Sequence, residues 1–212
     1  MSEARPLTHV LSIDPGLTNL GWISLCLDGA TWRVIACGCD DITGGSGRPD
    51  YAAVVLDWMT SYRAVHGVPN VVLIERQYDT VAIGNMQILP SALVMVALSA
   101  YCRVLWNSAC VLVDPRKQRA VHHINRQSIS RLPFTHELFH GMRIRQTLSP
   151  AQMDTVKRRA SLAAARVVLA SCCGYPDGHL LKNDHVADAV LTFHTWAPHV
   201  CNCLFLGAGP SF

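Results

Sequence analysis

The chain has 212 residues, half of them hydrophobic, and a net charge of +3 at pH 7. This length suits one domain with a sizeable core, and no apolar run reaches membrane-spanning length without interruption. The first residues lack the basic-then-apolar pattern of an export signal, and nine cysteines in apolar surroundings favour reduced thiols in an intracellular compartment.

The first expected elements are two strands joined by a tight turn. Residues 9–13 form a short apolar, β-rich run, and residues 20–27 form a second one. The turn-forming residues 15–19 between them predict a hairpin. Asp14 therefore ends a buried strand, where a carboxylate costs on the order of several kcal/mol unless it is paired or binds a metal. The alternative interpretation is that Asp14 closes the turn through its own backbone.

A second carboxylate ends a later strand. Residues 31–40 predict a third strand, and a Gly-rich loop leads to Asp50, which can cap a helix that ends near residue 66. Residues 71–74 are continuously apolar, as in a strand that is buried on both faces. Glu75 follows this strand directly. Two carboxylates at the ends of two buried strands indicate that Asp14 and Glu75 belong to the same functional site.

The middle of the chain predicts a very apolar helix. Residues 83–106 have a helical pattern, with Pro90 at an N-terminal turn or at a kink. Because this helix is apolar nearly all round, it must be buried inside the domain or against a partner. A fifth strand is expected over residues 109–113.

A basic segment follows the fifth strand, at about residues 115–160. Between residues 116 and 166 there are eleven basic residues and two acidic ones, a balance that favours binding of a polyanion over a plain solvated surface. A helix is expected from Ser149-Pro150 to about residue 172. The candidate DNA contacts are Arg116, Lys117, Arg119, Arg126, Arg143, Arg145, Lys157, Arg158 and Arg159.

The last informative stretch, KNDHVADAV, predicts a helix that carries acidic residues on one face. Asp184 and Asp188 are four residues apart, and His185 and Asp188 are three apart, so these side chains lie close on a helix. The alternative interpretation makes Asp184 the helix cap and Asp188 a surface residue. It explains Asp184 well, but small and apolar residues surround Asp188.

Together these carboxylates predict a divalent metal site. Oxygen ligands from separate elements favour Mg²⁺ or Mn²⁺. Two such ions, at roughly 3.5–4 Å, would contact both the attacking and the leaving oxygen of a phosphodiester. With the basic segment holding the phosphate backbone, the sequence predicts a metal-dependent nuclease.

Three motifs carry a family resemblance. SIDPGLTNLGW, VVLIERQ and HVADAV, in this order, resemble the RuvC-type Holliday junction resolvases of the RNase H-like superfamily. The details IERQ and KNDHVADA are most similar to the poxvirus and mitochondrial branch, and to the viral members in particular. The resemblance covers about residues 9–196. It implies a single α/β domain over residues 1–212, with a five-stranded mixed sheet flanked by helices. It also implies a homodimer that resolves four-way DNA junctions by paired nicks.

The resemblance also implies the site residues. Asp14, Glu75 and Asp188 match the metal ligands of the family, with two ions in each site. Lys117 is the candidate for a catalytic lysine after the fifth strand. The chain departs from most relatives at His185, where they carry a carboxylate, and Asp184 is the alternative source of the missing oxygen. Both His185 and Asp184 therefore remain candidate ligands.

Two other functional classes stay open. The first is a branched-DNA-binding protein that has lost catalysis, although the three matching carboxylates argue against it. The second is an actin-like ATPase, whose phosphate loop also starts with an acidic residue after a strand. The chain is short for the two duplicated domains of that class, and neither a nucleotide cofactor nor a membrane partner is expected. If the chain is poxviral, the host cytoplasm is the expected location.

Overall fold

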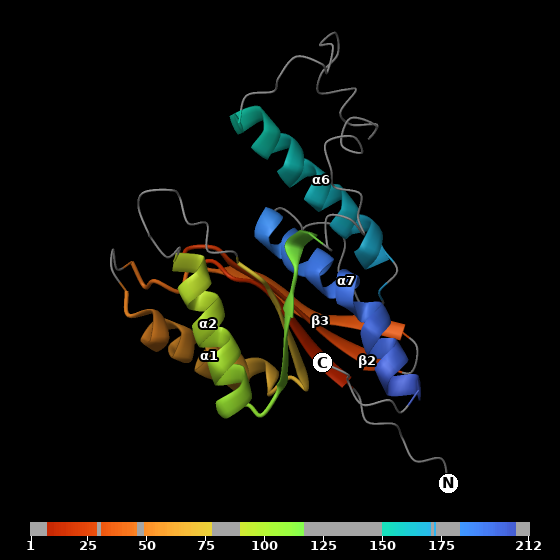
Figure 1. Ribbon diagram of the computed structural model, residues 1–212, viewed down its shortest axis with the longest axis horizontal. Coiled ribbons are helices and arrows are strands. Elements are labelled where there is room, and N and C mark those ends of the chain that lie inside the picture. The colour runs from red at the N-terminus through yellow and green to blue at the C-terminus, as the bar shows by residue number, and fades with distance from the viewer. Residues whose placement is uncertain are drawn as a thin grey trace.

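The computed structural model describes residues 8–28, 31–45, 49–77, 90–116, 150–170, 172 and 183–206; within these ranges, the side chains of residues 28, 150–154, 157 and 198–206 are not described. The described chain contains five strands and four helices (Figure 1). In chain order they are β1 (Thr8–Asp14), β2 (Leu20–Asp28), β3 (Thr31–Asp40), α1 (Tyr51–His66), β4 (Val71–Glu75), α2 (Pro90–Val104), β5 (Ala109–Val113), α6 (Pro150–Ala170) and α7 (Asp184–Leu206).

The five strands form one mixed sheet in the order β3-β2-β1-β4-β5. The first three strands pair antiparallel, so the expected hairpin is confirmed, while β1, β4 and β5 run parallel. The parallel pairs require crossovers, and α1 and α2 lie in those connections. The predicted five-stranded mixed sheet flanked by helices is confirmed.

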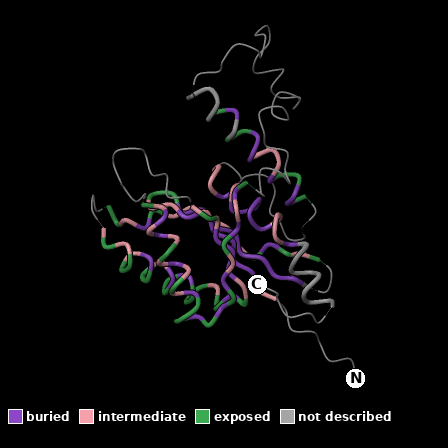
Figure 2. Tube along the Cα trace, in the orientation of Figure 1, coloured by how far each residue is buried: buried purple, intermediate pink, exposed green. Residues whose placement is uncertain are grey.

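Side chains on the strands alternate between two apolar layers. On β1, Leu11 and Ile13 face the layer that contains α1 and α2, while Val10 faces the layer that contains α6 and α7. Ser12 shares the face of Val10, and its hydroxyl donates a 2.8 Å hydrogen bond to the Ala189 carbonyl of α7. Figure 2 shows buried strands at the centre and exposed residues on the outer sides of α1 and α2. Because both faces are covered, the strands read as apolar runs in the sequence.

Local signals set the helix boundaries. The Asp50 carboxylate accepts hydrogen bonds from the backbone N–H groups of Ala52 and Ala53 at 3.0 and 3.3 Å, which makes it the cap of α1. Gly67 ends this helix with a φ of 80°. Pro90 is the first residue of α2, so it lies at the N-terminal turn of the described helix. Residues 83–89 of the predicted helix lie outside the described chain.

The outer helices differ in how they are covered. α6 packs mainly on α7, and Figure 1 shows it reaching away from the sheet. On α2, Val96 and Val104 are 57% and 78% exposed, so part of this apolar helix is not covered within the described chain. No described helix combines the length and the hydropathy needed to span a membrane.

Candidate active site

Two of the expected carboxylates lie at the same edge of the sheet. Ile13 of β1 is in register with Ile74 of the parallel strand β4, so Asp14 and Glu75 follow at adjacent strand ends. By strand alternation Asp14 shares the face of Val10, and Glu75 shares the face of Leu73, and both of these belong to the layer under α7. The structure therefore places Asp14 and Glu75 side by side beneath α7.

The start of α7 is capped by Asn183. Its side-chain oxygen accepts a 2.8 Å hydrogen bond from the backbone N–H of His185, as an N-cap residue does. The interpretation of Asp184 as the cap is therefore wrong: Asn183 is the cap, and Asp184 is the first residue of the helix. The Cys39 thiol of β3 also hydrogen-bonds Asn183. The cap fixes the rotation of α7, and with it the directions of the acidic side chains.

Gly21 allows α7 to approach the sheet. It lies opposite Asp14 in the β1–β2 pair. A Cβ atom at this position would overlap the backbone carbonyl and the Cβ of His185. Only glycine therefore fits where the first turn of α7 lies against β2. Gly21 was not among the residues expected at the site, although a glycine inside a strand is a known sign of close backbone approach.

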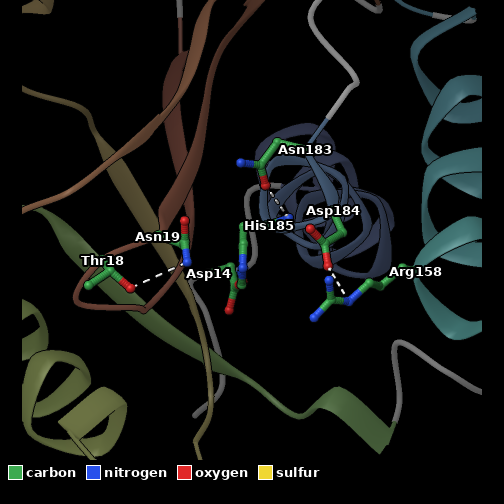
Figure 3. A network of polar contacts seen from close by, with 7 residues as sticks. All are labelled: Asp14, Thr18, Asn19, Arg158, Asn183, Asp184 and His185. Carbon is green, nitrogen blue, oxygen red and sulfur yellow. Dashed lines mark hydrogen bonds and ion pairs between the residues drawn. The ribbon is translucent and has the colours of Figure 1, made fainter. Parts of the chain in front are cut away.

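His185 faces Asp14 across this contact. Its Nδ1 atom lies 2.9 Å from Asp14 Oδ2, and both side chains are partly buried (Figure 3). The hydrogen bond to Asp14 raises the pKa of His185 above 6.5, and the charges of Asp14, Asp184 and Asp188 add to this effect while burial opposes it. The Asp14 carboxylate thus contacts α7, the helix that covers its own face of the sheet, which the turn-closing interpretation does not predict.

Asp184 points in a different direction from its neighbour. Its Oδ2 atom lies 3.1 Å from Nε of Arg158 on α6. Figure 3 shows His185 turned toward Asp14 and Asp184 turned toward Arg158, on different sides of α7. His185 and Asp184 are the two candidates for the fourth ligand position, beside Asp14, Glu75 and Asp188. They point to different sides of α7, and His185 is the one that lies beside Asp14.

Asp188 is partly buried on the side of α7 that contacts α6. Burial raises its pKa to about 7, and the negative charges of Asp14 and Asp184 contribute to the shift. Ser161 of α6 donates a hydrogen bond to the carboxylate, which together with the charge of His185 acts in the opposite direction. This carboxylate is set among groups that disfavour its charge, which is a common property of functional sites.

The remaining candidate residues are distributed as follows. Arg116, Arg158 and Arg159 are exposed. Lys117, Arg119, Arg126, Arg143 and Arg145 lie outside the described residues, as does the side chain of Lys157. Among the described residues, no three His, Cys, Asp or Glu side chains are placed closely enough to enclose a metal ion. Site residues that the sequence analysis missed are Gly21, Asn183 and Ser161.

The raised pKa of Asp188 predicts a pH-dependent stability for the metal-free protein. A carboxyl whose pKa is higher in the folded state stabilises the fold below its unfolded value near 3.8, and this contribution is lost as the pH rises through about 7. The free energy of unfolding in EDTA should therefore fall by on the order of 2 kcal/mol more, between pH 5 and 8, in the wild type than in Asp188→Asn. Denaturant titrations at both pH values measure this difference. Identical pH dependences in the two proteins would contradict the burial of this charge.

Sequence comparison finds no matching family model and no matching curated protein. Among solved structures, T. thermophilus RuvC in complex with a Holliday junction substrate is similar with a TM-score of 0.52 and 16% identity, over 91% of this chain and 96% of that one. The yeast mitochondrial Holliday junction resolvase Ydc2 has a TM-score of 0.52 and 14% identity, over 97% and 87% of the two chains. The fowlpox virus Holliday junction resolvase has 16% identity over 77% and 99%, but its TM-score of 0.38 carries no argument.

The two stronger likenesses span nearly the whole of this chain. They agree with the three motifs of the sequence. SIDPGLTNLGW covers the end of β1 and the start of β2, VVLIERQ covers β4 and the two residues after it, and HVADAV lies in the first turns of α7. The chain therefore has the RNase H-like fold of the RuvC-type resolvases, as these motifs predicted.

Proposed function

We propose that this protein is a metal-dependent endonuclease that resolves four-way DNA junctions by paired nicks. The observation that carries the proposal is the convergence of Asp14, Glu75 and the start of α7 at one edge of the sheet. This edge lies in a fold that resembles T. thermophilus RuvC, whose structure was solved with a Holliday junction substrate. A helix with exposed arginines lies beside it.

The donor set suits a divalent cation. Burial, followed by the neighbouring charges of Asp14 and Asp184, raises the pKa of Asp188, so its surroundings in the metal-free protein stabilise the negative charge poorly. Carboxylate oxygens favour Mg²⁺ or Mn²⁺, and an imidazole shifts the preference toward Mn²⁺. We propose Asp14, Glu75, His185 and Asp188 as ligands. When bound, two such ions would activate the attacking water and stabilise the leaving oxygen.

The residues of the chain would then position the scissile phosphate. Asp14 lies at the turn of the hairpin, and Pro15-Gly16 leads the backbone away from it. Asn183 and Gly21 fix α7 so that His185 faces the strand ends, and Asp188 follows about one turn later on the helix. Lys117 follows β5 closely in the sequence and is proposed to contact the phosphate near the reacting bond.

The test of this function is a cleavage assay on a synthetic four-way junction, with a linear duplex of the same sequence beside it. Paired, symmetric nicks in the junction with Mg²⁺ or Mn²⁺, and little cleavage of the duplex, are expected. Tight junction binding without cleavage in any divalent metal would favour the inactive branched-DNA-binding protein. Hydrolysis of ATP without cleavage would favour the ATPase class.

We propose that the exposed cations of α6 bind the DNA backbone. Arg159 and Arg166 are both exposed and are seven residues apart, so they share one face of this helix. The variant Arg159→Gln/Arg166→Gln leaves the Arg158–Asp184 pair in place. It should weaken junction binding and reduce the slope of log K against log salt by about 0.9 for each phosphate that is no longer neutralised. Arg63→Gln removes an exposed charge from α1, across the sheet, and serves as the control. Equal slopes in all three proteins would contradict this role.

We propose that the protein is a homodimer, since paired nicks in a two-fold symmetric junction require two sites related by a two-fold axis. Val96, Ala100 and Val104 are exposed and lie four residues apart, so they form one apolar stripe on α2. Val96→Glu/Val104→Glu should convert dimers to monomers in light scattering, because burying two carboxylates in an apolar interface is unfavourable. Val167→Glu on α6, where the valine is 74% exposed, is the matched control. A monomeric wild type that makes paired nicks would contradict the proposal.

A further inference from the structure

Helix α6 contacts the acidic face of α7 at two points. Arg158 forms its 3.1 Å ion pair with Asp184, and one turn further along α6 Ser161 donates its hydrogen bond to Asp188. Arg158 and Ser161 are three residues apart, and Asp184 and Asp188 are four apart, so each pair lies on one face of its helix. The same helix that carries exposed arginines thus contacts the carboxylates of the candidate site.

The ion pair contributes little to stability. The side chain of Arg158 is 67% exposed and that of Asp184 is 24% exposed, and pairs of this kind contribute about 0–1 kcal/mol. The Asp184 carboxylate nevertheless lies close to the site, because it is one helical turn before Asp188 on the same face of α7. The main effect of the ion pair is therefore on the Asp184 carboxylate: Arg158 orients it and balances its negative charge.

We propose that Arg158 is a positioning residue that holds the Asp184 carboxylate on the α6 side of α7 and keeps it out of the metal ligand set. This inference rests on the proposed function, because it concerns the same metal site. Asp184 lies one helical turn before Asp188 on the same face of α7, so a carboxylate released from Arg158 remains close to this proposed ligand. Arg158 thereby leaves the position beside Asp14 to His185.

Loss of Arg158 has a predictable effect on metal binding. The variant Arg158→Gln releases an acidic oxygen next to His185 and Asp188 and leaves its negative charge without a counterion. Divalent cations should then bind more tightly, by about fivefold at low ionic strength, as expected for one added charge several ångströms from a divalent ion. The fold itself should be affected little, with a Tm change of about 4 °C or less.

The experiment measures Mn²⁺ binding to the full-length, DNA-free protein from the electron paramagnetic resonance signal of free Mn²⁺. The proteins are the wild type, Arg158→Gln, Arg158→Lys, Asp184→Asn and the double variant Arg158→Gln/Asp184→Asn. Arg159→Gln is the matched control, since it removes the same charge from an exposed neighbouring position of α6.

We expect tighter Mn²⁺ binding in Arg158→Gln than in Arg159→Gln, and near wild-type binding in Arg158→Lys, which keeps the positive charge. In the Asp184→Asn background, Arg158→Gln should shift the affinity no more than Arg159→Gln does in the wild type. The inference is overturned if Arg158→Gln matches Arg159→Gln, if its effect persists without Asp184, or if Asp184→Asn alone abolishes binding. In each of these cases the wild type still binds Mn²⁺. A wild type that binds none would instead overturn the metal site itself, and the inference with it.

Discussion

Asp14→Asn and Glu75→Gln should each reduce junction cleavage by at least about a thousandfold while junction binding stays near the wild-type level. Each substitution keeps the size of the side chain and removes one negative charge. An amide at position 14 can still accept the hydrogen bond from Nδ1 of His185, which Asp14 receives at 2.9 Å. The arrangement of β1 and α7 should therefore survive, and the loss should be confined to metal binding.

The measurement combines single-turnover cleavage with junction binding in EDTA. Phosphate contacts from basic residues supply most of the affinity for DNA, so the loss of a metal ligand leaves binding largely intact. Asp57→Asn, at an exposed position of α1 on the opposite side of the sheet, controls for the loss of one acidic charge. If either site variant nicks junctions at near the wild-type rate, the proposed metal site is in the wrong place.

The sheet was predictable because its signals are local. The parallel strands β1 and β4 are buried on both faces, so each reads as an apolar run that ends in a carboxylate. The helix boundaries at Asp50 and Pro90 follow from capping and from the missing N–H of proline. From these signals alone, Asp14 and Glu75 could be assigned to the ends of two strands of one sheet.

The details at the start of α7 were not predictable, because they depend on contacts between distant parts of the chain. Asn183 and Asp184 are both good capping residues, and the sequence gives no reason to prefer either. The choice follows from packing: Gly21 of β2 receives the backbone of His185, which sets the position of the first turn. The Arg158–Asp184 pair likewise joins two helices whose relative placement has no signature in the sequence.

His185→Ala should reduce cleavage strongly, by about a hundredfold, whereas Asp184→Asn should change it by less than about fivefold. The reason is the direction of the two side chains: His185 contacts Asp14 at the strand ends, while Asp184 is held by Arg158 on the other side of α7. His185→Asp should recover much of the activity with Mg²⁺, because a carboxylate is a better ligand for this ion than imidazole is.

The metal preference and the pH dependence separate a ligand role from a structural one. An imidazole binds a metal only when it is deprotonated, so wild-type cleavage should fall as the pH decreases toward the pKa of His185, which Asp14 raises. His185→Asp should lose less activity over the same range and should favour Mg²⁺ over Mn²⁺ more than the wild type does. Single-turnover rates with each metal between pH 5.5 and 8.5 give both comparisons. A His185→Ala enzyme with the wild-type rate and pH profile, together with an inactive Asp184→Asn, would assign the fourth position to Asp184. The ion pair with Arg158 would then have to open before cleavage.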